Sequence, residues 1–126
     1  MILVDTSFLI DYFRKQEPAL FFVKKYRKEH LAINTVIAME LYQGARNKAE
    51  LTKIQSELAG IYMLPINDSI ADLALQLSQK YALSHHIGLS DTFIAATALI
   101  YDLELKTLNL KDFHFIPSLR VSNSFD

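Results

Sequence analysis

The sequence predicts a single α/β domain with an open, mostly parallel sheet of four or five strands and helices on both faces. Short apolar runs of four to six residues alternate with longer stretches in which apolar residues recur at helical spacing. Wholly apolar strands are typical of parallel sheets, because both faces of such a sheet are covered. The length of 126 residues fits one domain, which we place over residues 1–126, and 51% hydrophobic residues fit a globular protein.

Capping residues set the expected boundaries in the first half of the chain. The strand over residues 1–4 ends at Asp5, and Thr6 is expected to cap a short helix that runs to about Phe13. A second helix is expected over 19–28 and a second strand over 31–34. Thr35 is the expected N-cap of the helix that follows and runs to Ala45.

The same signals continue in the second half. A helix over 49–59 is expected to end at Gly60, a residue that favours the position after a helix C-terminus. Asn67 or Asp68 should cap the longest helix, whose apolar residues follow an i, i+3, i+4, i+7 stripe. Ser90 should cap a helix over 91–101 that is apolar almost all round and therefore buried. The remaining expected strands span 61–66, 103–108 and 119–122.

Composition excludes several classes of site. The absence of cysteine rules out disulfides, thiolate zinc sites, iron–sulfur clusters and a cysteine nucleophile. Three glycines leave no glycine-rich nucleotide loop. No apolar run approaches the roughly 18 residues that span a bilayer, so we expect a cytoplasmic protein that does not contact membranes.

Four acids lie where solvation alone would not place them. Asp5 ends the first strand, Glu40 and Asp91 lie within a turn or two of helix starts, and Asp112 follows the fourth strand. The carboxyl ends of parallel strands form the crevice in which α/β sheets bind ligands, so these positions should share one edge. Each acid also has a purely structural explanation, as a helix cap, a helix-dipole partner, a half-exposed helical residue or an Asx-turn residue.

Carboxylates that converge in this way repel one another unless a cation compensates them, and no Lys or Arg adjoins Asp5, Glu40 or Asp91. An all-oxygen set suits Mg²⁺ or Mn²⁺, and such ions support phosphoryl chemistry. The four histidines lack zinc spacing and are interpreted as surface or packing residues. Four further polar residues are placed to hydrogen-bond the carboxylates or a water: Thr6, Ser7, Thr107 and Asn109.

Basic residues gather in the first half of a chain whose net charge is −1. Lys24, Lys25, Arg27 and Lys28 crowd a few turns, and Arg46 is a further candidate for contact with a phosphate backbone. Other cations close to them in sequence are Arg14, Lys15, Lys48 and Lys53. This charge is explained either by an ordinary solvated helix face or by a footprint for a phosphate backbone.

Four segments in this order resemble PIN domains, and most closely the VapC-like ribonuclease toxins of type II toxin–antitoxin systems. They are ILVDTSFLI around Asp5, ELYQG from Glu40, GLSDTFIAATA around Asp91 and LKTLNLKDF ending in Asp112 and Phe113. The resemblance runs from Met1 to about Val121, nearly the whole chain. The basic segment 24–28 is not among the motifs of that family.

The resemblance implies a three-layer α/β/α sandwich and an endoribonuclease that depends on Mg²⁺ or Mn²⁺ and cuts RNA with a metal-activated water. It implies that Asp5 and Asp91 are the principal metal ligands and that Glu40 and Asp112 complete the pocket. Thr107 and Asn109 correspond to a Thr-x-Asn element of the family. The resemblance also implies a homodimer, and a heterotetramer or larger assembly with an antitoxin protein that blocks the pocket.

Three other interpretations stay open at this point. A PIN nuclease with a housekeeping role in RNA processing would share the chemistry but have no antitoxin. A non-catalytic module that binds RNA or protein would have no reason to keep four mutually repelling carboxylates. A phosphoacceptor receiver domain would need paired acids after the first strand, where only Asp5 stands.

Overall fold

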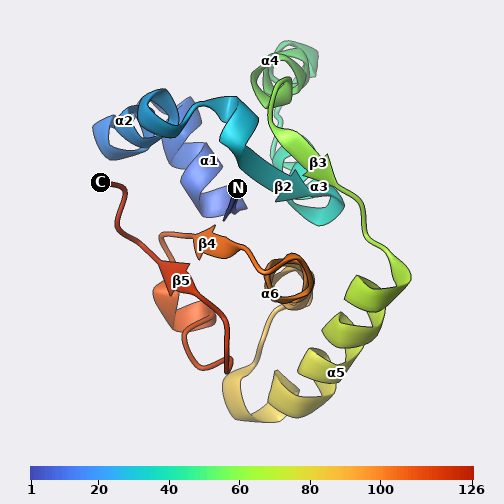
Figure 1. Ribbon diagram of the computed structural model, residues 1–126. Coiled ribbons are helices and arrows are strands. Elements are labelled where there is room, and N and C mark those ends of the chain that lie inside the picture. The colour runs from blue at the N-terminus through green and yellow to red at the C-terminus, as the bar shows by residue number, and fades with distance from the viewer.

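The computed structural model describes residues 1–126 and contains one five-stranded parallel sheet (Figure 1). The strands follow the order β3-β2-β1-β4-β5, and β1 pairs with β2 through Ile2 opposite Leu31 and with β4 through Leu3 opposite Leu105. The strands are β1 (Ile2–Val4), β2 (Leu31–Asn34), β3 (Tyr62–Leu64), β4 (Glu104–Lys106) and β5 (Val121–Ser122). The α-helices are α1 (Thr6–Phe13), α2 (Glu17–Tyr26), α3 (Thr35–Gln43), α4 (Lys48–Leu58), α5 (Asp68–His85) and α6 (Leu89–Tyr101), with 3₁₀ turns η1 (Lys28–His30) and η2 (Leu110–Asp112).

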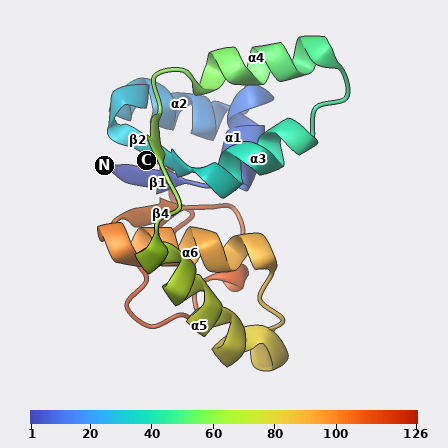
Figure 2. The same ribbon diagram turned by 90° about the vertical axis from the view of Figure 1, so that its right-hand side faces the viewer.

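The strand order divides the helices between the two faces of the sheet. The chain moves outward from β1 through β2 to β3 and then returns to the other side of β1 for β4 and β5. Because parallel crossovers are right-handed, a reversal of direction puts the later helices on the opposite face. Figure 2 shows α1 to α4 on one side of the sheet and α5 with α6 on the other. The α/β sandwich expected from the sequence is confirmed.

A buried core stabilises the short strands of the sheet. Leu3, Ile33 and Leu105 of the central strands are fully buried. Phe125 is 9% exposed and meets the ring of Phe8 edge-on with centroids 4.9 Å apart. The C-terminus therefore returns from β5 to pack against the α1 and α2 side (Figure 1).

Three predicted helix caps are wrong, each by one or two positions. Asp5, rather than Thr6, caps α1, because its carboxylate accepts from the backbone N–H of Phe8. Asn34, rather than Thr35, caps α3 in the same way. Asn34 is the last residue of β2 and Asp5 directly follows β1, so in both cases strand and helix meet without a loop. The third, α6, begins at Leu89 after Gly88 and has no side-chain cap, so the expected cap Ser90 lies inside the helix.

Other boundaries shift by a few residues. The helix expected over 19–28 ends at Tyr26, because Arg27 has a positive φ of 69° and the chain turns into η1. Gly60 has a φ of 90° after α4, as expected, and Asn67 caps α5. The strands expected over 61–66 and 103–108 are shorter than predicted, since only their central residues pair in the sheet. None of the helices combines the length and the apolarity that a bilayer-spanning segment needs.

Candidate active site

The site lies where the direction of the strand order reverses. Asp5 directly follows β1 and Thr107 directly follows β4, the neighbouring strand across the reversal. Thr107 Oγ1 donates a hydrogen bond of 2.6 Å to Asp5 Oδ2. Open α/β sheets bind ligands in the crevice outside the carboxyl ends of the strands at such a point.

Asp5 is held in one orientation by three donors. Its Oδ1 accepts from Ser7 Oγ at 2.7 Å and from the backbone N–H of Phe8 at 3.0 Å, while Oδ2 accepts from Thr107. Burial raises the pKa of Asp5, which is 4% exposed, although these hydrogen bonds act to lower it. A carboxylate has about four acceptor positions, so one position on Oδ2 has no protein donor.

Small hydroxyl groups link the other parts of the site. Thr6 Oγ1 donates to Glu40 Oε1 at 2.7 Å, which joins α1 to α3. Ser7 Oγ accepts from the backbone N–H of Leu108 at 3.1 Å, and this contact joins α1 to the segment after β4. Asn109 is exposed, and its backbone N–H, not its side chain, donates to Thr107 Oγ1.

Asp91 is the carboxylate most affected by its surroundings. Partial burial in the first turn of α6 raises its pKa to about 6, with further contributions from the negative charges of Asp112, Glu40 and Asp5. No hydrogen bond reaches its carboxylate. The structure therefore brings the four predicted acids within interaction range, and Asp91 faces the other three without a hydrogen-bond donor of its own.

The residues fit a hard divalent cation, with waters completing its coordination. No group of three or more acidic or histidine side chains is arranged to hold an ion by itself. Mg²⁺ usually keeps several waters and binds through one or two carboxylates together with substrate phosphate. Asp5 offers one open oxygen position, and Asp91 offers a half-buried carboxylate without a donor. Carboxylate and water oxygens are the donors that suit hard cations such as Mg²⁺ and Mn²⁺.

Asn34 is a site residue that the sequence analysis did not select. It is fully buried at the end of β2 and caps α3, which carries Glu40. Its Nδ2 donates to Thr97 Oγ1 of α6 at 3.0 Å. The signal was present, because a polar residue at the carboxyl end of a buried strand is the same feature that marked Asp5.

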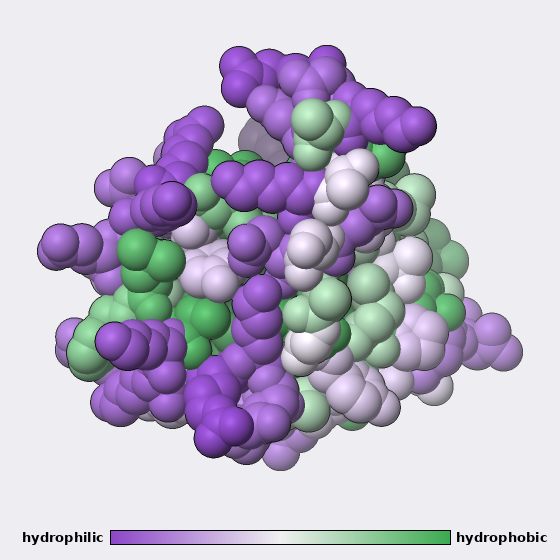
Figure 3. Space-filling model, turned by 90° about the horizontal axis from the view of Figure 1, so that it is seen from above, coloured by the Kyte–Doolittle hydropathy of each residue, from purple (hydrophilic) through white to green (hydrophobic).

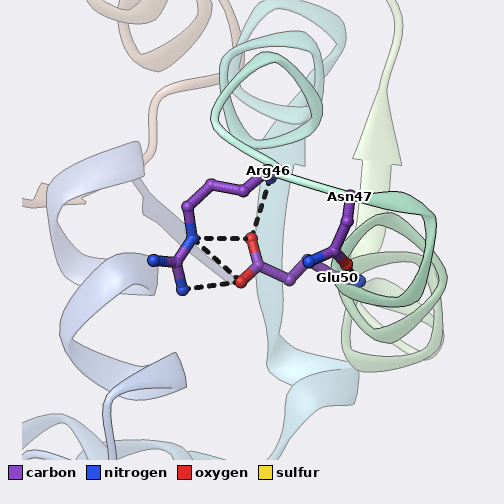
Figure 4. Close-up of polar contacts among 3 residues, drawn as sticks. All are labelled: Arg46, Asn47 and Glu50. Atoms are coloured by element: carbon purple, nitrogen blue, oxygen red, sulfur yellow. Dashed lines mark hydrogen bonds and ion pairs between the residues drawn. The ribbon is translucent and has the colours of Figure 1, made fainter.

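The predicted basic residues separate into two groups. Three of them are paired with acids: Arg27 with Glu29 at 3.0 Å, Lys28 with Glu57 at 3.4 Å, and Arg46 with Glu50 at 2.8 Å (Figure 4). Lys28 Nζ also donates to the backbone carbonyl of Glu57 at 2.7 Å, so it fastens η1 to α4. Lys24 and Lys25 are exposed at the end of α2 and have no acidic partner.

Comparison with known proteins gives a consistent set of relatives. A family model described as PIN domain matches residues 2–114. The chain is 38% identical over 122 residues to Ribonuclease VapC10 of Mycobacterium tuberculosis, covering 95% of this chain and 91% of that protein. It is 28% identical over 124 residues to Ribonuclease VapC19 of the same organism, covering 95% and 98%.

Solved structures match over the same extent. A toxin–antitoxin complex from Klebsiella pneumoniae contains a chain with a TM-score of 0.81 and 31% identity, covering 98% of this chain and 97% of that one. A DNA-bound VapBC from Salmonella typhimurium has a TM-score of 0.82 at 22% identity, covering 97% and 98%, and this second likeness concerns the fold alone.

Proposed function

The chain belongs to the PIN domain family, and on that premise we propose that it is a metal-dependent endoribonuclease and the toxin of a type II toxin–antitoxin pair. The observation that carries the proposal is the identity of 38% to Ribonuclease VapC10 across 95% of the chain. The resemblance to VapC-like PIN domains expected from the sequence motifs is confirmed.

The names of the similar proteins favour a toxin role over a housekeeping role. Both curated relatives are named VapC ribonucleases, and a solved relative at 31% identity belongs to a toxin–antitoxin complex. We therefore propose RNA as substrate, a cognate antitoxin as partner, and a homodimer that forms a heterotetramer or larger assembly with it. We place the activity in the cytoplasm, where RNA and antitoxin would meet it.

In the proposed reaction Asp5 and Asp91 would be the principal residues that hold the metal, and Glu40 and Asp112 would complete the acidic pocket. A bound Mg²⁺ or Mn²⁺ would supply activation of a water and neutralisation of charge on the phosphate. Thr107 and Ser7 orient the Asp5 carboxylate toward the crevice, and Thr6 orients Glu40. Because strands and helix starts carry these groups, their positions are fixed before RNA arrives, which lowers the cost of ordering the site.

Cleavage of mixed cellular RNA by the purified protein tests the activity. Reactions with Mg²⁺, with Mn²⁺ and with EDTA are compared for the wild type, Asp5→Asn and Asp72→Asn. Asp72 is an exposed acid on α5 and serves as the matched control. We expect discrete fragments that require metal, vanish in Asp5→Asn and persist in Asp72→Asn.

Two outcomes would contradict the proposal in different ways. Absence of metal-dependent cutting by folded protein that carries no inhibitor would favour a binding module. Cutting that causes no growth arrest when the wild type is expressed in a bacterial host would favour a housekeeping nuclease. For a toxin, the wild type arrests growth and Asp5→Asn does not.

A further inference from the structure

A cavity of about 550 Å³ opens between α1, α3 and α4. Its apolar wall contains Ile10, Phe13, Leu41 and Ile54. Three cations also line it: Arg14 at the end of α1, Arg46 before α4 and Lys53 on α4. Figure 3 views the molecule from the side of α2 and α4 and shows hydrophilic side chains there with apolar ones exposed between them.

The cavity and the acidic site share one residue. Glu40 lines the cavity and also accepts the hydrogen bond from Thr6, next to Asp5. Its negative charge also helps to raise the pKa of Asp91, after burial and Asp112. A ligand that extends from the acidic site past Glu40 therefore enters this cavity.

Three cations and three glutamates line the cavity, but the cations are not all paired with them. Glu50 binds Arg46 through both of its oxygens, with Arg46 Nη2 at 2.8 Å and Nε at 3.1 Å from Oε2 (Figure 4). Glu57 is paired with Lys28, which lies outside the cavity. Arg14 and Lys53 have no acidic partner at ion-pair distance. Two exposed cations that form no ion pair thus stand beside a site made of four acids, although Lys53 lies near enough to Glu50 to help lower the pKa of that carboxyl.

We propose that this cavity holds the single RNA strand next to the cleaved bond, with Arg14 and Lys53 on its phosphates and the apolar wall against an unstacked base. The proposal rests on the proposed function and names where its substrate lies. An acidic site repels a polyanionic strand, so cations beside the site have to supply the attraction. Single-stranded RNA offers both phosphates and unstacked bases, which suits cationic and apolar groups in one cavity.

Arg46 can contact the RNA strand only when Glu50 does not hold its guanidinium. Asn47 Oδ1 accepts a hydrogen bond from the backbone N–H of Glu50 at 2.9 Å, which fixes the first turn of α4. That turn holds the Glu50 carboxylate against the guanidinium and the backbone N–H of Arg46. Glu50 therefore withholds one cation from the strand, and Glu50→Gln should make it available.

The basic residues at the end of α2 provide a matched comparison. Lys24 and Lys25 are as free of acidic partners as Arg14 and Lys53, but they do not line the cavity. A double variant at either pair removes two positive charges from the surface. Only the variant of the cavity pair, Arg14 and Lys53, should weaken RNA binding by more than the loss of two positive charges from the surface does by itself.

Binding of a fluorescent single-stranded RNA of mixed sequence, measured in EDTA at several salt concentrations, tests the proposal. In EDTA no metal-dependent cutting occurs, so the readout does not depend on the nuclease activity. We expect Arg14→Gln with Lys53→Gln to weaken binding about tenfold or more. The slope of log K against log salt should fall by about 1.4, since each lost phosphate contact on a single strand removes about 0.7.

The other variants make the result specific. Lys24→Gln with Lys25→Gln should change affinity and slope much less, Arg14→Lys with Lys53→Arg should bind like the wild type, and Glu50→Gln should bind several-fold tighter. Equal effects of the two double Gln variants, or no effect of the cavity pair in a protein with an unchanged melting temperature, would overturn the proposal. If the cavity pair has no effect on RNA binding, we would infer that the cavity binds a protein segment and not RNA. A third result separates the two proposals. If RNA binding by the wild type requires Arg14 and Lys53 but no metal-dependent cutting occurs, the proposed nuclease activity is contradicted and the RNA-binding cavity is not.

Discussion

Thr107 Oγ1 lies 2.6 Å from Asp5 Oδ2 and donates a hydrogen bond to it across the reversal of the strand order. This contact joins the carboxyl ends of β1 and β4 at the centre of the site. Both residues are buried, so no water replaces the hydroxyl if it is removed. The hydrogen bond is therefore both a stabilising contact and one of the three that orient the Asp5 carboxylate.

We expect Thr107→Val to lower the free energy of unfolding by about 1.5–3 kcal/mol, because a hydrogen bond to a charged group is lost without a change of shape. RNA cleavage should fall as well, since Asp5 loses its orientation. Urea unfolding in EDTA and cleavage in Mg²⁺ measure the two effects. Thr107→Ser keeps the hydroxyl and is the control; equal behaviour of the Val and Ser variants would show that the hydroxyl has no such role.

Asn34 connects the two helices that carry Glu40 and Asp91, because it caps α3 and donates to Thr97 on α6. We expect Asn34→Ala to destabilise the protein by about 2–3 kcal/mol through loss of the cap and of a buried hydrogen bond. Cleavage should fall too, since the two acids lose their common support.

Asn67→Ala is the matched control for this prediction. Asn67 caps α5 with the same geometry, its Oδ1 accepting from the backbone N–H of Ile70 at 2.9 Å, but it is exposed and has no contact with a second helix. Its loss should cost only about 1 kcal/mol and leave cleavage unchanged. Similar activity in the two variants would mean that Asn34 acts as a cap and nothing more.

Removal of the charge on Asp91 should stabilise the metal-free protein. Its carboxylate is half-buried, accepts no hydrogen bond and faces three other acids. We expect Asp91→Asn to raise the free energy of unfolding in EDTA by about 1 kcal/mol, once solvent screening of this half-exposed group is allowed for. The same variant should lose the rise in melting temperature that Mg²⁺ or Mn²⁺ gives the wild type, because an ion stabilises only the state that binds it. An unchanged response to metal would remove Asp91 from the ligands.

The placement of the acids could be predicted from the sequence because it follows from topology. Asp5 ends an apolar strand, Asp112 comes soon after another, and parallel strands end at one edge. Glu40 reaches the same edge because α3 follows the end of β2. For these three acids the alternation of strands and helices was enough for the inference. Asp91 lies at the start of α6, which follows α5 and not a strand, so its place at this edge depends on how α6 packs.

Contacts between side chains could not be predicted in the same way. Asp5 and Thr6 are both good caps, and the choice between them depends on where the last sheet hydrogen bond forms, which here is from Asp5 N–H to the carbonyl of Lys106. The pairing of Arg46 with Glu50 depends on the turn before α4. Charge counting treated Arg27, Lys28 and Arg46 as available for RNA, whereas each of them has an acidic partner.

The response to metal should depend on pH through Asp91. Its pKa is about 6 in the folded protein against 3.8 for the ordinary carboxyl, so between these values the folded state holds a proton that the unfolded state has lost. Stability without metal therefore falls as the pH rises through this window and changes no further from this group above about 6.5. Protonation also removes the charge that would bind a cation, so the rise in melting temperature caused by Mg²⁺ should be small at pH 5 and larger at pH 7.

Melting curves at pH 5, 6 and 7, with Mg²⁺ and with EDTA, measure this dependence. The wild type is compared at each pH with Asp91→Asn, so that the difference between the two proteins isolates the contribution of this carboxylate. In EDTA the stability of the wild type relative to Asp91→Asn should decline from pH 5 to pH 7. In Mg²⁺ only the wild type should show a rise in melting temperature, relative to EDTA, that grows with pH. An increment that is the same at pH 5 and pH 7 would mean that the proton on Asp91 and the cation do not compete for the same carboxylate.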